Sequence, residues 1–396
     1  VADTGGATGY TILKNQQTIS LSQIQPYDVI TYDSMSNTLL VSDLRLTCKY
    51  QNPSPSPKAP TSITLLGHTF PVLESAWNFT DQVSAGEQVS LLMTVDGQVA
   101  AILPATNETR STALGFVTGE TTAELFLPNG GVLELTGSAS KLKNLNQVCF
   151  LSSSDENTLT ASRLTAQRAP GDFDPSAMTV GGYKVAPGVR VYEQFREGAQ
   201  VAVPLSSLDY GLIAQDQISA AHRNSSDIVD VIVLNNVTGD AYTYGRMVGH
   251  TTVTEEPIYD DEGNQTGTEK NYRTSWSLEN RNVLKFNERS GYGGKNGQFI
   301  GAVAGKNNMI ISTVQLNEFQ QVSPSDFFER EGRYYITLKG RTYAVADSVE
   351  CYKTATESWF SQETGMDRLR ACLAFSSKLT VYIDPIGDKV RIVTAN

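Results

Sequence analysis

Few residues of this chain have the types and spacing of a catalytic site. Its three histidines, His68, His222 and His250, are far apart and form no H-E-x-x-H pair, so a histidine-built zinc centre or catalytic triad is poorly supplied. No G-x-S-x-G nucleophile elbow occurs. The stretch 291–299, GYGGKNGQF, lacks the strand before it and the helix after it that a dinucleotide-binding loop needs. We therefore predict no catalytic residue and no cofactor.

Oxygen-rich side chains suggest two further kinds of site. A turn in the stretch YDDEGNQTG offers hard oxygen ligands of the kind that calcium prefers, although it lacks EF-hand spacing. Its possible ligands are Asp260, Asp261, Glu262 and Asn264. A glycoside hydrolase needs only two carboxyl groups about 5 to 9 Å apart. Four aspartates between positions 209 and 230 are candidates for such a pair: Asp209, Asp216, Asp227 and Asp230. The alternative is that these acids keep turns and strand edges soluble.

Aromatic residues suggest a glycan-binding patch. The chain has 17 tyrosines, and rings on one face could stack on sugars. The residues considered for this role are Tyr242, Tyr244, Trp276 and Tyr292. The alternative is that alternating tyrosines pack against cross-strand neighbours.

Composition narrows the class of protein. The net charge is -11, with 42 acidic and 31 basic residues and no dense Lys/Arg run, so we expect no nucleic-acid partner. No stretch approaches the roughly 20 apolar residues that span a bilayer, so we expect no membrane span. The chain begins at Val1 without a methionine, which fits a mature protein whose signal peptide was removed, or a fragment.

The four cysteines do not form a metal-binding motif. Cys48, Cys149, Cys351 and Cys372 include no C-x-x-C pair. Cys351 and Cys372 are close enough in sequence to form a disulfide, and the alternative is two buried free thiols.

Hairpin patterns predominate along the chain. The stretches 89–103, 123–137 and 378–393 are pairs of apolar runs split by short turns, in which Gly97, Gly130 and Gly387 can take positive φ. Helical spacing is scarce. It is clearest at 364–376, and weaker signals occur at 203–215 and from 323 to 326.

One hairpin unit recurs. The stretches SITLLGHTFPVL (62–73), AMTVGGYKVAPGVRVY (177–192) and YYITLKGRTYAV (334–345) share a strand, a glycine turn and a second strand. Each is followed by a closing hairpin, which gives repeat units 63–103, 178–244 and 336–395. A weaker fourth version begins at YTILKNQQTIS. These degenerate copies indicate that a small β unit was duplicated.

The fold class predicted is therefore mainly β: tandem small barrel-like or sandwich-like modules built from duplicated hairpin units, with a few short helices. We predict three modules, 1–104, 105–250 and 251–396. The proline-rich stretch 51–60 is extended and is expected to strap across a module. Residues 255–277 are predicted to form a long, exposed, acidic hairpin.

The residues also carry a resemblance. The stretch YDVITYDSMSNTLLVSD with its continuation, and the stretches VIVLNNVTGDAYTYG and LTVYIDPIGDKVRIV, resemble the β-repeat region of surface proteins of gut Firmicutes that carry S-layer homology domains. The S-layer homology motif itself, which would anchor such a protein to the cell wall, is absent from the sequence. The resemblance implies an exported, cell-surface or extracellular protein of a Gram-positive bacterium.

These observations favour a non-catalytic structural protein, a subunit of a filament or of an S-layer-like assembly. Its expected partners are other copies or other surface proteins. The alternative is an adhesin or glycan-binding module that recognises cell-wall or host glycans, and a third possibility is an enzyme that acts on polysaccharides.

Overall fold

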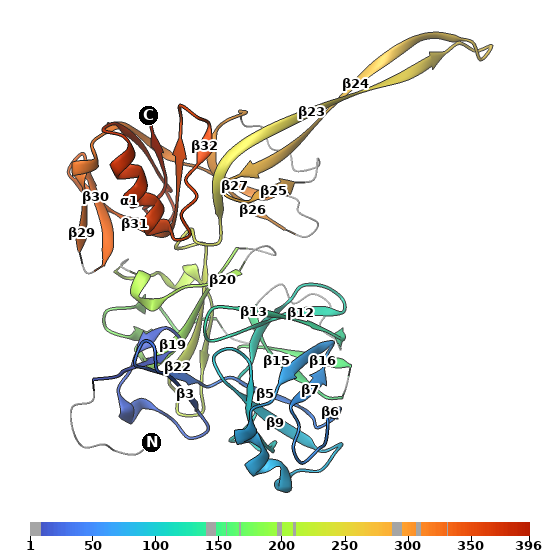
Figure 1. Cartoon of the computed structure of the whole chain (residues 1–396), viewed down its shortest axis with the longest axis vertical. Helices are drawn as coiled ribbons and strands as arrows, with labels where there is room; N and C mark the ends of the chain where they lie inside the picture. The colour runs from blue at the N-terminus through green and yellow to red at the C-terminus, as the bar shows by residue number, and fades with distance from the viewer. Residues whose placement is uncertain are drawn as a thin grey trace. The chain divides into compact units, whose positions relative to one another are not determined.

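The computed structural model describes residues 9–139, 148–155, 157–165, 168–195, 200–208, 211–286, 295–305, 310–330 and 332–396. The fold is mainly β, as predicted, with small modules built from duplicated hairpin units and a few short helices. The chain divides into two compact units (Figure 1). Unit 1 comprises 1–194 and 201–235, and unit 2 comprises 195–200 and 236–396. The three-module division drawn from the sequence stays a prediction.

Unit 1 begins with a small sheet of order β2-β1-β4-β3. Its strands are β1 (Thr11–Lys14), β2 (Gln17–Thr18), β3 (Val29–Asp33) and β4 (Thr38–Ser42), with the 3-10 turn η1 (Leu21–Gln23) before β3. Asn15 and Gln16 form the β1–β2 turn, both with positive φ. Two successive positive φ values are typical of a type I′ turn, which matches the twist of the flanking strands.

The first repeat copy follows in unit 1. It contains β6 (Pro53–Ser54), β7 (Ser62–Leu65), β8 (His68–Pro71), η2 (Glu74–Gln82), β9 (Gln88–Met93) and β10 (Val99–Pro104), and β5 (Arg45–Lys49) pairs with β9. The proline-rich stretch is a strap, as predicted. Its β6 pairs with β7, the Trp77 indole donates to the carbonyl of Pro60 at 2.8 Å, and the Thr80 hydroxyl donates to that of Lys58 at 2.8 Å.

A second sheet of unit 1 has the order β13-β12-β11-β15-β16-β14. Its strands are β11 (Leu114–Val117), β12 (Thr122–Phe126), β13 (Val132–Thr136), β14 (Ser138–Ala139), β15 (Val148–Ser153) and β16 (Thr158–Arg163). Residues of this sheet share one apolar core with the first repeat copy, including Leu91, Ile102 and Leu125, which are fully buried.

The second repeat copy completes unit 1. Its strands are β17 (Phe173–Asp174), β18 (Thr179–Val180), β19 (Tyr183–Gln194), β20 (Gln200–Ala202), β21 (Ile218–Arg223) and β22 (Val229–Asn235), with the 3-10 turns η3 (Leu205–Ser207) and η4 (Gln215–Gln217). Strand β19 pairs with β22 in parallel. The closing hairpin is β21–β22, in which the apolar run 229–234 pairs antiparallel with the preceding strand, 218–223. This copy therefore closes before the end of the predicted unit 178–244.

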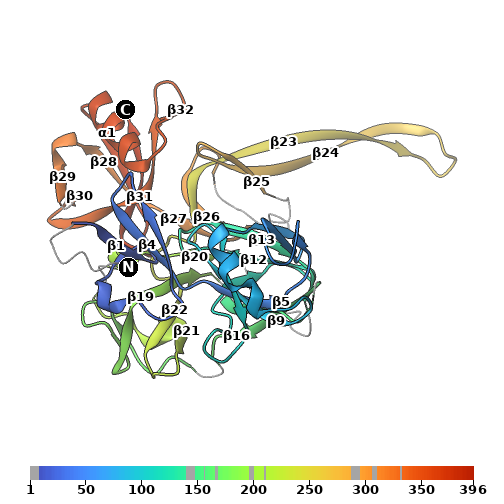
Figure 2. The same cartoon turned by 60° about the horizontal axis from the view of Figure 1, so that its bottom comes forward.

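Unit 2 contains a sheet of order β25-β24-β23-β26-β27. Its strands are β23 (Thr243–Tyr259), β24 (Gln265–Glu279), β25 (Val283–Phe286), β26 (Phe299–Ala304) and β27 (Ile310–Gln315). Strands β23 and β24 are much longer than their neighbours and extend away from the rest of the sheet in both views (Figures 1 and 2). The predicted long hairpin is confirmed.

The third repeat copy ends the chain. It comprises β28 (Asn317–Val322), η7 (Pro324–Asp326), β29 (Phe327–Arg330), β30 (Arg333–Leu338), β31 (Arg341–Lys353), β32 (Ser358–Trp359), α1 (Gly365–Phe375), β33 (Leu379–Ile383) and β34 (Lys389–Ala395). Helix α1 is the one predicted at 364–376. The Thr364 hydroxyl caps it by accepting from the Asp367 amide at 3.1 Å. Leu369 and Cys372 face the core.

The three copies share a topology. In each, the second strand of the opening hairpin meets the last strand of the closing hairpin in parallel: Val72 with Val99, β19 with β22, and β31 with β34. Each opening turn has two residues of positive φ. They are Leu66 and Gly67, Gly181 and Gly182, and Lys339 and Gly340. The duplication inferred from the sequence is therefore present in the fold.

The closing hairpins also share a β-bulge. Their registers shift across a single residue on the last strand, which is Ala100 in β10, Asp230 in β22 and Arg391 in β34. A bulge leaves one residue outside the regular pairing and re-aims its side chain. The same backbone position therefore carries three different side chains.

Some local predictions need correction. Gly97 and Gly130 have positive φ, but in the third closing turn that conformation belongs to Asp388, not Gly387. The weak helical signals at 203–215 and 323–326 correspond only to short 3-10 turns. All four cysteines are buried free thiols, so for Cys351 and Cys372 the expectation of two buried free thiols is confirmed.

Candidate functional site

The outer part of the β23–β24 hairpin, residues 253–271, is exposed along nearly its whole length, and we call it the arm. All its residues are exposed except the partly buried Gly267. Strand β26 pairs only with residues 243–246 of β23, and β25 pairs only with residues 276–279 of β24. Within the described residues, both outer edges of the arm therefore lack a neighbouring strand.

The turn of the arm contains the predicted calcium ligands. The Asp260 carboxylate accepts hydrogen bonds from the amides of Glu262 at 3.0 Å and Asn264 at 2.8 Å. These bonds, with the one to Asn264 first, lower the pKa of Asp260. Gly263 supplies the positive φ of 83°. Asp260 is thus used to close the turn, and no group of three or more His, Cys, Asp or Glu side chains suited to a metal ion occurs among the described residues.

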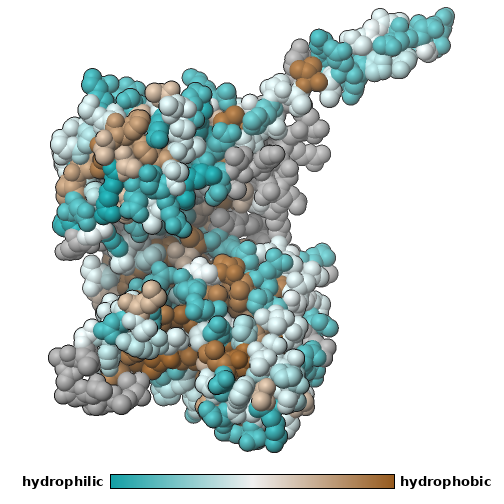
Figure 3. All heavy atoms as spheres, in the orientation of Figure 1, coloured by the Kyte–Doolittle hydropathy of each residue, from teal (hydrophilic) through white to brown (hydrophobic). Residues whose placement is uncertain are grey.

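The arm is acidic and otherwise polar. It carries six carboxylates against one lysine: Glu255, Glu256, Asp260, Asp261, Glu262 and Glu269 against Lys270. Lys270 lies 3.2 Å from Glu255 across the hairpin, with both side chains 56% exposed, so this pair contributes little. Figure 3 shows the arm mostly in hydrophilic colours. Val253, Ile258 and Tyr259 are its exposed apolar residues.

Trp276 lies at the base of the arm. It pairs with Gly249, and a Cβ on that glycine would lie 3.0 Å from the indole ring. The ring therefore packs closely over Gly249 and joins a small core with Met247 and Leu278. Because the ring is partly buried in this way, its packing explains its position without a ligand.

Tyr242 and Tyr244 are buried in unit 2, with 7% and 6% exposed. The Tyr244 hydroxyl donates to the Gly239 carbonyl at 2.8 Å, and the Arg391 guanidinium lies 4.7 Å from its ring centre. Tyr242 packs edge-on against Phe195 at 5.4 Å. The arrangement does not support sugar stacking on these two rings. Tyr292 lies outside the described residues.

Arg391 organises the buried charges near Tyr244. Its guanidinium bonds to Asp384, to Asp240 at 2.6 Å and to the Thr238 carbonyl. Burial alone would lower the pKa of Arg391, but Tyr244, Asp384 and Asp240 outweigh it and raise that pKa. No local sequence pattern indicates this network, because Asp240 and Arg391 are 151 positions apart in the chain.

Of the four aspartates considered as hydrolase acids, the structure describes Asp216, Asp227 and Asp230. Asp227 pairs with Arg223 at 2.9 Å, and Asp230 lies 2.6 Å from His222. Asp216 lies in η4, and Asp209 lies outside the described residues. Each described acid is therefore accounted for by a turn or a pair.

A cleft of about 420 Å³ in unit 2 has aromatic walls. Phe299, Tyr352 and Tyr382 line it, and Phe299 lies 5.4 Å and 4.9 Å from the two tyrosine rings. Polar residues complete the lining: Arg246, Glu318, Gln320, Gln321, Thr354, Glu357, Thr380, Thr394 and Asn396. No local sequence pattern indicates this cleft, because its lining comes from strands far apart in the chain.

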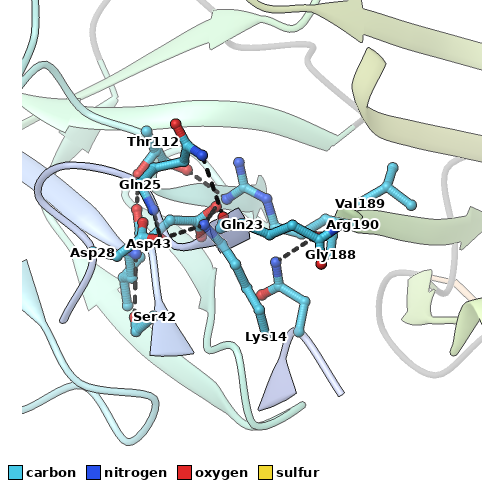
Figure 4. Close-up of polar contacts among 12 residues, drawn as sticks. Lys14, Gln23, Gln25, Asp28, Ser42, Asp43, Thr112, Gly188, Val189 and Arg190 are labelled. Carbon is cyan, nitrogen blue, oxygen red and sulfur yellow. Dashed lines mark hydrogen bonds and ion pairs between the residues drawn. The ribbon is translucent and has the colours of Figure 1, made fainter. Parts of the chain in front are cut away.

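A larger cleft of about 1280 Å³ lies in unit 1. Its floor is a polar cluster in which Lys14 lies 2.8 Å from Asp28 and 3.6 Å from Asp43 (Figure 4). Burial raises the pKa of Asp28 more than Lys14 lowers it. For Asp43, burial is outweighed by Arg190, Lys14 and other cations, so its pKa is lowered.

Comparison with known proteins finds no matching family, no similar curated protein and no similar solved structure. Among the described residues, no helix has the length and apolar character needed to cross a membrane.

Proposed function

We propose that this chain is a non-catalytic structural protein of a Gram-positive cell surface, a subunit that assembles with other copies through its arm. The extracellular location rests on the resemblance of the repeats to S-layer-associated surface proteins. The assembly role rests on one observation above all: the two unpaired edges of the arm.

An exposed strand edge offers a row of backbone donors and acceptors to another chain. A two-stranded hairpin alone is only marginally stable in water, so a projecting arm gains stability when a third strand covers an edge. Backbone pairing of this kind gives affinity regardless of side chains. The arm therefore suits docking on a sheet edge of a neighbouring copy.

The two edges of the arm are not equivalent. Pro257 pairs with Thr268 within the regular register that runs from Arg246 to Ile258. Proline has no N–H to donate to β24, so Pro257 occupies a position whose backbone groups face away from β24. The β23 edge therefore lacks a donor at that point. In an antiparallel pair, the opposite residue also faces outward, so Thr268 offers its N–H on the β24 edge. No proline interrupts β24, and we assign the docking edge to it.

Thr268→Pro tests this assignment, because it removes one outward donor and leaves the pairing of β23 with β24 in place. We expect the wild-type protein to form larger species with rising concentration, and Thr268→Pro to weaken this association at least tenfold. Sedimentation velocity and electron microscopy of the purified protein measure it.

Thr268→Ala is the matched control, since it removes the same side chain but keeps the N–H. It is expected to assemble like the wild type. Monomeric wild-type protein at every concentration, or equal assembly by Thr268→Pro, would contradict the proposal.

A second function, binding of neutral glycans, is favoured by the aromatic cleft of unit 2. Aromatic rings beside amide and hydroxyl groups suit a sugar's apolar face and its hydroxyls. A glycan array of the wild type against Tyr382→Ala tests it, with the exposed arm variant Tyr259→Ala as control. If no neutral glycan depends on Tyr382, this function is excluded for the cleft.

A further inference from the structure

The large cleft of unit 1 gathers four arginines, although the chain as a whole is acidic. Five cationic side chains line it, Lys14, Arg45, Arg110, Arg163 and Arg190, together with four acidic ones, Asp28, Asp43, Glu108 and Asp230. The chain as a whole has a net charge of -11. A local cluster of arginines in such a chain needs a counterion or a ligand.

The acidic side chains of the cleft are already engaged. Asp28 pairs with Lys14, Asp230 with His222 at 2.6 Å, and Glu108 accepts from the Tyr27 hydroxyl at 3.1 Å. Asp43 lies 3.6 Å from Lys14. The charge of Asp43 also acts on Arg190 and Arg45, whereas Arg110 and Arg163 take part in none of these pairs.

Three arginines of the cleft have unused hydrogen-bonding groups. Arg110 and Arg163 are exposed and, within the described residues, form no hydrogen bond or ion pair with another side chain. Arg45 donates only a long bond of 3.4 Å to the Glu108 carbonyl, and its buried Nε has no partner there. Burial lowers the pKa of Arg45 more than the charges of Asp43 and Asp28 raise it.

The wall behind these arginines is firmly built. The Arg190 guanidinium donates to the Thr112 carbonyl at 2.8 Å (Figure 4). The Asn15 side-chain amide donates to the Gly188 carbonyl at 2.7 Å. Asp43 keeps one buried carboxylate oxygen without a hydrogen-bond partner among the described residues.

The rest of the lining is mostly hydroxyl and amide side chains. They are Ser22, Gln23, Gln25, Thr47, Asn107, Ser111, Thr112, Ser152, Ser162, Asn224, Ser225 and Ser226. Such groups match the hydroxyls of a sugar. Seven apolar residues also line the cleft and could contact the apolar faces of sugar rings: Pro26, Phe150, Leu151, Leu164, Ala186, Pro187 and Ile228.

From this geometry we infer that the unit 1 cleft binds an anionic polysaccharide, a sugar chain that carries carboxylate or phosphate groups. The planar guanidinium groups of Arg45, Arg110 and Arg163 would hold the oxyanions, since each can bond two oxygens at once. The hydroxyl and amide side chains would bind the sugar hydroxyls. This site is independent of the arm and of the aromatic cleft.

The test uses the whole chain and calorimetric titration with four probes. Hexagalacturonate carries carboxylates, a glycerol phosphate polymer carries phosphates, maltohexaose is neutral, and poly-L-glutamate is an acidic polypeptide. We expect binding of at least one of the first two, weakening as salt is raised because salt screens exposed charges, and none of maltohexaose. The two anionic probes distinguish the sources of the negative charge.

The variant Arg110→Gln/Arg163→Gln removes two exposed charges without disturbing a contact in the described structure. It is expected to weaken binding at least tenfold. Arg168→Gln, an exposed arginine of unit 1 outside the cleft lining, is the matched control and should bind like the wild type.

Three results would overturn the inference. They are no binding of either anionic polysaccharide, equal binding by the double variant, and binding of poly-L-glutamate as tight as that of the sugars, which would indicate an acidic peptide partner instead. Assembly through the arm is measured separately, so either proposal can fail alone.

Discussion

The second and third repeat copies have the same strand arrangement but carry different side chains at equivalent positions. Both contain a three-stranded opening segment, a parallel pair and a closing hairpin with a bulged residue on its last strand. At the bulge, Asp230 of the second copy lines an open cleft, whereas Arg391 of the third copy is 1% exposed. The difference shows that the pairing of the strands does not depend on the bulged side chain.

The segments between the two hairpins differ as well. In the third copy, α1 is capped by Thr364 and packs Leu369 and Cys372 into the core. The corresponding segment of the second copy contains Pro204 just before η3 and Gly211 at positive φ, both unfavourable inside a helix. The burial of apolar strands therefore fixes the common framework, and the connections vary around it.

Removing the buried charge of the third copy should have the largest effect. Arg391→Met leaves Asp384 and Asp240 without their shared cation, and breaking a buried pair in this way costs about 3 to 5 kcal/mol. Urea unfolding, monitored by hydrogen exchange of the amides in β33 and β34, measures this loss of stability in the third copy itself.

The same substitution at an exposed pair is the control. Arg341 lies 2.6 Å from Asp388 with 61% and 47% of the two side chains exposed, so Arg341→Met should cost below about 1 kcal/mol. If Arg391→Met costs no more than that, the bulge of the third copy does not depend on its charge.

The contribution of Asp240 to the unfolding free energy should depend on pH, and its effect should be smaller than that of Arg391. Burial raises the pKa of Asp240, but Arg391 and Lys389 outweigh it, so the pKa is lowered from 3.8. A lowered folded-state pKa contributes stability above pH 3.8 that is lost as the pH falls through the folded value. Asp240→Asn should therefore cost about 1.5 to 3 kcal/mol at pH 6 and progressively less below pH 3.8. Unfolding free energies across this pH range check it, and a cost independent of pH would contradict it.

Much of this fold could be predicted from sequence, because hairpins are local. The Lys339-Gly340 turn and the apolar alternation beside it predict the opening hairpin of the third copy, and helical spacing with Thr364 predicts α1. The parallel contacts could not be predicted in this way. Val185 and Val229 are paired but are separated by a long connection whose path no local pattern determines.

The candidate sites were harder to predict than the fold. Tyr242 and Tyr244 were singled out for their residue type, but whether a ring faces solvent depends on packing, and both are buried. Arg45 and Arg163 line one cleft although 118 positions separate them in the sequence. Only the protrusion at 255–277 was visible in advance, since a run of polar residues with Asp-Glu-Gly-Asn at its centre is a local signal.

The bulge of the second copy should be the most tolerant position. Asp230→Ala gives it the residue that the first copy has in Ala100, and the lost partner, His222, keeps 17% of its side chain exposed, so water can replace the hydrogen bond. We expect a cost below about 1 kcal/mol, measured by hydrogen exchange of β21 and β22 during urea unfolding. A cost as large as that of Arg391→Met would mean that each of these two copies needs its own charged side chain to hold the bulge. The pairing of the strands would then depend on the bulged side chain.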